Sequence, residues 1–231
     1  MTRLRSLALL PFVLLTAPSP AAGQSVVVDE GVFTISLDGV PVGEETFSIR
    51  RSGLGTDGSL LGHGVVRITV DGAVTEVRPV LQARPSDGST GEYQVRVTGA
   101  DAQEARLALA GNRYISQFTS SGGTEEREFL ARPGTRILEV MVAHQYYFLR
   151  GVRPGMPSFI IEPRSRASLS LPATDINEDT VQVGPNSVQA RRVVFGEGET
   201  ARTVWYDTQG RVLRVEVPAL GYTAHRQDLA G

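Results

Sequence analysis

The side chains of this sequence that could do acid–base or metal chemistry do not come in the spacings that such chemistry needs. The three histidines, His63, His144 and His225, stand far apart and lack the i, i+4 pairing or the cysteine partners of a metal site. His63 lies between two glycines, which favours an exposed loop. His144 lies in an apolar segment, which favours a hydrogen-bonded histidine in the core or at the edge of a cavity. We therefore expect no metal ion and no cofactor.

Candidate nucleophiles and acid pairs are also poorly arranged for catalysis. The sequence has no Gly-x-Ser-x-Gly motif, and Ser120-Ser121-Gly122-Gly123 fits the tip of a hairpin. Glu44-Glu45 and Glu125-Glu126 are adjacent pairs within expected strands, so the two members of each pair point to opposite faces. General acid and base catalysis needs two carboxyl groups that converge on one substrate. Lysine is absent, which excludes Schiff-base chemistry. We expect no catalytic residues and no enzyme activity.

The aromatic residues suggest binding more than catalysis. Tyr146, Tyr147 and Phe148 are consecutive, and at helical spacing they would fan over most of the circumference of a helix. They could anchor the helix in a core with the tyrosine hydroxyls at its rim, or they could line a ligand cavity. Methionine adapts to ligands of variable shape. The candidate ligand-binding residues are Met141, His144, Tyr147, Phe148 and Trp205.

The segment that would position most of these residues is 135–150, which is predicted to be a helix. Its apolar and aromatic residues recur at steps of three and four, which is the helical period. Gly151 is expected to end the helix at a positive φ, and Pro154 prevents its continuation. A buried pair of strands is the alternative, because Val140 and Val142 are β-branched. The helical stripe consists of Ile137, Met141, His144 and Phe148 on one line and Leu138, Val142 and Leu149 on the next.

The remainder of the chain has the period-two pattern of antiparallel strands. Turn residues interrupt this pattern every eight to twelve positions between Val26 and Arg132. Asp38-Gly39 and Asp71-Gly72 are predicted to form tight hairpin turns with positive φ angles. Another hairpin is expected around residues 207–210.

Three segments carry apolar residues on both faces of an expected strand. Antiparallel strands of this kind are covered on both sides, and the predicted helix is the expected cover. The segments are Tyr114–Phe118, Phe159–Ile161 and Val204–Tyr206.

The first 23 residues have the order of zones found in secretory signal peptides. Arg3 and Arg5 precede an apolar stretch at 7–15, and small residues follow up to Gly23. The stretch is too short to span a bilayer, so we expect cleavage near Gln24 and a periplasmic or secreted protein without an integral membrane segment.

The mature chain is expected to form a single domain, residues 24–231, that buries its own core. It has no cysteine, so disulfides cannot stabilise it. The formal charge of −2 includes the two arginines of the signal peptide, so the charge of the mature chain is −4. A mild negative charge argues against nucleic acid as a partner.

Two short motifs and their order resemble a known group of proteins. They are Leu37-Asp38-Gly39-Val40-Pro41-Val42-Gly43, at the centre of residues 33–49, and Trp205-Tyr206-Asp207 followed by Gly210–Arg214. These motifs resemble exported bacterial domains of unknown function that look like relatives of the LolA-like lipoprotein-carrier superfamily. The resemblance implies a half-barrel that wraps helical segments around an apolar cavity able to hold an acyl chain.

These observations together predict a mainly β fold with a single antiparallel, strongly curved sheet, a half-barrel or open barrel, around one principal helix. A closed lipocalin-like barrel or a two-sheet sandwich is the alternative. The expected function is that of a non-catalytic binding or carrier module for an apolar or amphiphilic, lipid-like ligand. The alternative function is that of a structural component of the cell envelope, which would bind a protein partner through a sheet edge.

Overall fold

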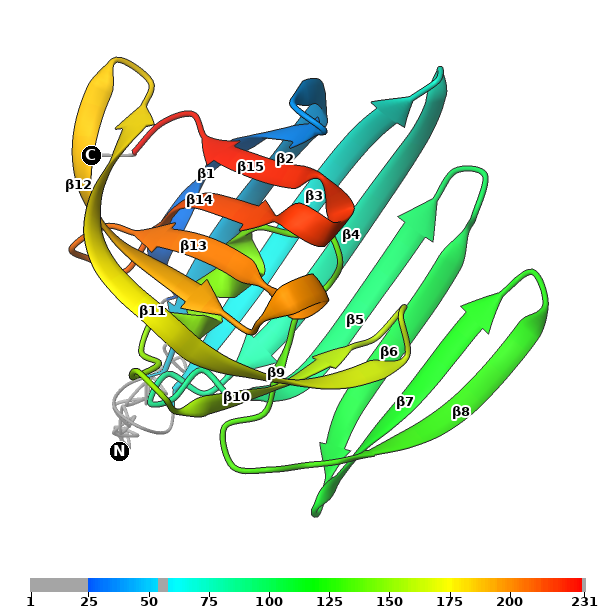
Figure 1. Ribbon diagram of the computed structural model, residues 1–231. Coiled ribbons are helices and arrows are strands. Elements are labelled where there is room, and N and C mark those ends of the chain that lie inside the picture. Colours follow the sequence, from blue (N-terminus) through cyan, green and yellow to red (C-terminus); the bar gives the residue numbers. More distant parts are fainter. Residues whose placement is uncertain (1–24, 54–57, 230–231) are drawn as a thin grey trace, which may run out of the picture.

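The computed structural model describes residues 25–53 and 58–229, which form one large and mostly antiparallel sheet (Figure 1). The predicted signal peptide, residues 1–23, lies outside the described residues. The strands are β1 (Val26–Leu37), β2 (Val40–Ser52), β3 (Ser59–Val70), β4 (Ala73–Ala83), β5 (Thr90–Thr98), β6 (Gln103–Ala110), β7 (Arg113–Ser120), β8 (Gly123–Leu130), β9 (Arg136–Ile137), β10 (Pro157–Glu162), β11 (Ala167–Val183), β12 (Asn186–Phe195), β13 (Arg202–Tyr206), β14 (Val212–Val217) and β15 (Tyr222–Arg226).

Most strands pair with their neighbours in sequence. The order across the sheet is β8-β7-β6-β5-β4-β3-β2-β1-β15-β14-β13-β12-β11-β10-β9, so the first and last strands lie side by side. The two predicted Asp-Gly turns are confirmed, because Asp38 and Gly39 have φ angles of 47° and 79°, and Asp71 and Gly72 have φ angles of 49° and 78°. These positive angles match the right-handed twist of the flanking strands.

The sheet curls around an interior without closing into a barrel (Figure 1). Its edges are β8 and the two-residue strand β9, which pairs with β10 in parallel. A side chain connects the two end regions, because Arg166, in the turn after β10, donates a hydrogen bond of 2.9 Å to Glu125 of β8. The prediction of a mainly β fold with one open, curved sheet is confirmed. The sheet is mostly and not wholly antiparallel, because β9 and β10 are parallel.

The prediction of a principal helix at residues 135–150 is wrong. Arg136–Ile137 forms β9, and a 3₁₀ helix of six residues, η2 (His144–Leu149), follows an irregular stretch. Met141 interrupts any helical path because its φ angle is 61°. Gly151, predicted to be a left-handed helix stop, does not have a positive φ angle, and Arg150 ends η2 in the right-handed region.

Side-chain hydrogen bonds explain why this stretch can be irregular and still be buried. Glu45 accepts from the backbone N–H groups of Ala143 and His144, at 2.6 Å and 3.0 Å. Gln145 accepts from the N–H of Glu139 at 2.5 Å. A buried N–H needs a partner, and here side chains take the place of the carbonyl groups that an α-helix would supply. The apolar residues at helical spacing therefore reflect a segment whose side chains are buried in all directions, and not an α-helix.

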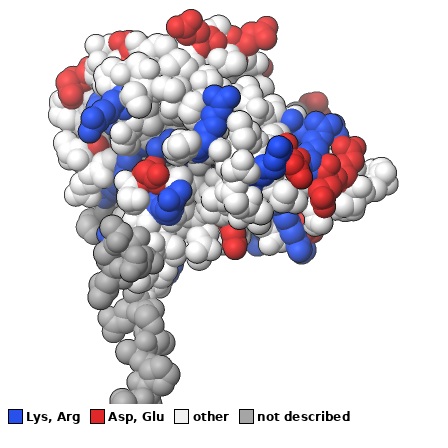
Figure 2. Space-filling model, turned by 90° about the horizontal axis from the view of Figure 1, so that it is seen from below, with Lys and Arg blue, Asp and Glu red and all other residues white. Residues whose placement is uncertain are grey.

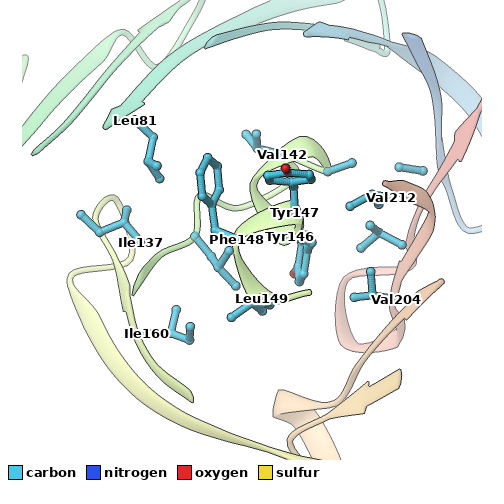
Figure 3. Close-up of a cluster of buried hydrophobic side chains, with 14 of the residues drawn as sticks. Leu81, Ile137, Val142, Tyr146, Tyr147, Phe148, Leu149, Ile160, Val204 and Val212 are labelled. Atoms are coloured by element: carbon cyan, nitrogen blue, oxygen red, sulfur yellow. The ribbon is translucent and has the colours of Figure 1, made fainter. Parts of the chain in front are cut away.

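The segment 138–149 fills the interior of the curled sheet. Figure 3 shows its aromatic side chains pointing towards strands on several sides. Tyr146, Tyr147 and Phe148 all belong to the main core, because the surrounding sheet can receive side chains in every direction. The Tyr206 hydroxyl donates to the carbonyl of Tyr146 at 2.9 Å, and the Arg136 guanidinium donates to the carbonyl of Phe148 at 2.7 Å.

A second hydrophobic cluster lies apart from this core. It contains Trp205, whereas the neighbouring residues Val204 and Tyr206 belong to the main core. The strand β13 is therefore covered on both faces, as the sequence predicts. The cover of Trp205 comes from β11 and β12 and not from a helix, since its cluster consists of Val181, Val183, Ala190, Trp205 and Leu213.

Candidate functional site

A groove lies beside Met141, near the turns that follow β1, β3 and β10. Its volume is about 390 Å³. The strand side is mostly apolar, and the side formed by the turn at 163–166 is polar. The groove is lined by Leu37, Ile68, Val70, Thr75, Val77, Val140, Met141, Arg164 and Ser165.

Met141 enters the groove from an unusual backbone conformation. A φ angle of 61° is left-handed, and this conformation costs a residue with a β-carbon about 1–2 kcal/mol. Met141 is half-buried and packs against the main core. Strained residues that the surrounding structure holds in place are concentrated at functional sites. The flexible thioether side chain is therefore presented to the groove by a backbone that is fixed on both sides.

A buried polar cluster lies directly behind the groove. Glu139 is buried, and its carboxylate accepts hydrogen bonds from Arg164 Nε at 2.7 Å and from the Tyr93 hydroxyl at 3.0 Å. Burial raises the pKa of Glu139, and Arg164 opposes that rise. Burial also raises the pKa of Tyr93 far above its ordinary value, and the nearby Glu139 raises it further. Tyr93 therefore remains a neutral donor to the carboxylate.

A second buried contact fixes the segment that carries Met141. His144 Nδ1 lies 2.5 Å from a carboxylate oxygen of Glu45, and both side chains are fully buried. Gly62 and Gly64 of β3 make room for the side chains of η2: a β-carbon at Gly64 would lie 2.7 Å from His144 Cε1, and one at Gly62 would lie 3.2 Å from the Phe148 ring. His144 Nε2 is buried without a hydrogen-bond partner in the described ranges.

The five predicted ligand-binding residues do not converge on one cavity. Met141 lines the groove. His144, Tyr147 and Phe148 follow Met141 closely in sequence, but their side chains are buried in the interior of the curled sheet. Trp205 belongs to the separate cluster. A binding role for these residues stays a prediction, and of the five the groove itself involves Met141 alone.

The other residues of the groove were not among the predicted ligand-binding residues. Leu37, Ile68 and Val77 occupy inward-facing positions of predicted strands. The period-two pattern of these strands therefore indicated that the three side chains point to the interior. Arg164 stands in a turn between Pro163 and Ser165, and no sequence signal connects it with Glu139. That connection depends on how the sheet curls.

The remaining histidines lie in strands. His63 is exposed, as expected, but it lies within β3 and not in a loop. Burial lowers the pKa of His225, a half-buried residue of β15. Between residues 25 and 229, with 54–57 left aside, no group of three or more His, Cys, Asp or Glu side chains is placed to hold a metal ion. None of the helices in these ranges has the length and hydrophobicity needed to cross a lipid bilayer.

The exposed surface and the sheet edge carry mixed charges. Basic and acidic side chains are interspersed on the face shown in Figure 2. The edge strand β8 is mostly exposed and contains Glu125, Glu126, Arg127 and Glu128 in succession. Charged side chains on an edge strand disfavour the pairing of a further strand. The addition of a partner strand at the β8 edge is therefore disfavoured.

Comparison with known proteins gives structural neighbours of unknown function. No protein-family model and no curated protein matches the sequence. A β-barrel-like protein of the domain of unknown function DUF1849 from Brucella abortus superposes with a TM-score of 0.46 at 8% identity, covering 90% of this chain and 98% of that chain. A DUF1089 family protein from Pseudomonas aeruginosa superposes with a TM-score of 0.32 at 12% identity, covering 91% of this chain and 97% of that chain.

Proposed function

We propose that this chain is a binding module for a small apolar or amphiphilic molecule and that the groove beside Met141 is its site. One observation carries the proposal: an apolar groove contains a methionine that a left-handed backbone presents to it. Its volume of about 390 Å³ falls in the range of small-molecule sites, which are mostly apolar with a few placed polar groups.

The groove is a better candidate than the interior that the sequence suggested. The side chains of Tyr146, Tyr147, Phe148 and Leu149 are buried in the main core (Figure 3). A ligand in the interior would have to displace them from close packing. A ligand in the groove would instead add apolar contact to a surface that the chain already presents.

Titration with Nile red, an uncharged apolar dye, tests the proposal. We expect saturable binding to the parent protein and weaker binding to Val70→Glu and Met141→Glu, because each places a charge in the groove. Val74→Glu is the matched control, since Val74 belongs to the same hairpin and is 56% exposed but does not line the groove. Absence of saturable binding, or equal loss in the control, would contradict the proposal.

The proposal includes export of the module from the cytoplasm. It is supported by the order of charged, apolar and small residues in the first 23 positions. The N-terminus of protein recovered from the periplasm is determined by sequencing, and the mature chain is expected to begin near Gln24. An intact Met1 in that fraction would contradict export.

A further inference from the structure

Arg164 forms the charged end of the groove. Its Nε donates to Glu139 at 2.7 Å, and its Nη2 lies 3.4 Å from the carbonyl oxygen of Val140. Nη1 has no hydrogen-bond partner within residues 25–53 and 58–229, and the side chain is 21% exposed. One side of the guanidinium is therefore anchored to the protein, and the side chain of Arg164, which lines the groove, keeps N–H groups that no described residue accepts.

The anchor fixes the direction of these free N–H groups. Glu139 is completely buried as a side chain and is also bonded to the Tyr93 hydroxyl, so it cannot follow Arg164 into solvent. A guanidinium held in this way loses little conformational freedom when a ligand binds, and its planar fork suits an oxyanion with two oxygens. Arg164 is the charged residue of the lining, which includes no acidic side chain.

The remaining lining divides the groove into two chemical parts. The hydroxyl-bearing residues Thr75 and Ser165 also line it, whereas Leu37, Ile68 and Met141 are among its apolar residues. A neutral apolar ligand would leave the free N–H groups of Arg164 without a partner, and a ligand with an acidic head would satisfy them.

We propose that the ligand is an amphiphile with a carboxylate head group, which Arg164 binds while the apolar chain lies along Leu37, Ile68, Val77 and Met141. This inference rests on the proposed function, because it assigns a ligand class to the same groove. Arg164 is thereby a binding residue, and Glu139 is a positioning residue that acts through it.

Calorimetric titration with three ligands of one chain length tests the head group. The ligands are decanoate and decyl phosphate, each below its critical micelle concentration, and decanol, below its solubility limit, all at pH 8 and with Nile red as the neutral reference. A charge-assisted hydrogen bond predicts that decanoate binds the parent about tenfold more tightly than decanol. Tighter binding of decyl phosphate than of decanoate would overturn the assignment of a carboxylate.

The variants connect this preference to Arg164. Arg164→Gln alone would leave the buried Glu139 without its cation, so the double variant Glu139→Gln/Arg164→Gln is measured beside it. In folded variants we expect the preference for decanoate over decanol to vanish. Arg166→Gln is the matched control, because Arg166 pairs with Glu125 and does not line the groove, and it should keep the preference.

The outcomes separate the two proposals. If the parent binds Nile red but binds decanoate and decanol equally, the head-group inference fails and the proposed function stands. If the preference survives in the double variant, Arg164 is not the binding group and the inference fails. If the parent binds neither the dye nor any of the three amphiphiles, both proposals fail.

Discussion

Glu45 of β2 and His144 of η2 are 99 residues apart in the sequence, and their side chains meet in the interior with 0% exposure on each. The same carboxylate accepts the backbone N–H groups of Ala143 and His144. One glutamate thus fixes the start of η2 against the sheet and places the preceding Met141 at the groove.

Glu45→Gln is expected to destabilise the protein strongly. An amide retains one acceptor oxygen and places an NH₂ group against donors that the carboxylate had satisfied. Loss of charged hydrogen bonds in a buried site predicts a decrease of about 2–3 kcal/mol in the free energy of unfolding, measured by urea denaturation. Glu44→Gln, one position along on the outer face, serves as the control and should change stability by less than about 0.5 kcal/mol. Equal effects would mean that the buried contact contributes nothing specific.

Gly64→Ala is expected to destabilise by overpacking. The new methyl group would lie 2.7 Å from His144 Cε1, and shifting a packed interior costs about 1–3 kcal/mol. Gly151→Ala is the comparison, because a β-carbon there meets nothing within 4 Å and the φ angle is not positive. Thermal unfolding should show a lower Tm for the first variant and an unchanged or slightly higher Tm for the second. The opposite order would contradict the packing around His144.

The buried Glu139 predicts a pH-dependent stability. Its pKa in the folded protein is raised by burial above the ordinary value of 4.5, so the folded state holds the proton at pH values where the unfolded state has released it. Stability contributed by this group is therefore present below about pH 4.5 and falls as the pH rises towards the raised pKa. Urea denaturation of the parent and Glu139→Gln between pH 4 and 8 should show the parent losing stability relative to the variant over this range. A constant difference would show that the pKa of Glu139 is not raised.

Met141→Gly separates backbone strain from ligand contact. Glycine accepts a φ angle of 61° without penalty, and this relief opposes the loss of side-chain packing and the greater freedom of the unfolded chain. We expect the free energy of unfolding to change by less than about 1 kcal/mol. The affinity for Nile red should fall by about threefold or more, because the apolar contact between the methionine side chain and the dye is lost. Unchanged affinity would remove Met141 from the site.

Trp205 is expected to be insensitive to ligands in the groove. It lies in the separate cluster, where its indole N–H donates to Asp179 at 2.7 Å. Saturation with decanoate should leave its fluorescence emission maximum unchanged, and Trp205→Phe should bind Nile red with the affinity of the parent. A clear shift in the emission maximum would indicate that ligand binding in the groove changes the surroundings of Trp205.

Local sequence pattern was sufficient to predict most of the strands and the tight hairpin turns of this protein, although Arg136–Ile137, predicted to be helical, forms β9. The alternation of apolar and polar residues in segments such as 66–70 reflects a strand with one buried face, and an Asp-Gly pair can take the positive φ angles of a tight turn. Both properties depend on residues that are neighbours in sequence. For the same reason, the two apolar faces of Val204–Tyr206 correctly predicted a cover on each side of β13.

The conformation of residues 138–149 and the position of the groove depend on long-range contacts. Apolar residues at helical spacing indicate which side chains are buried, but an enclosing sheet buries side chains in every direction, so the spacing did not require an α-helix. The backbone conformation of this segment depends on hydrogen bonds to Glu45, which is remote in sequence. The pattern of the strand around Glu45 indicates only that it is one member of an acidic pair. Arg164 meets Glu139 and Val140 because the curled sheet brings its end strands over the interior, and no local pattern contains this long-range relationship.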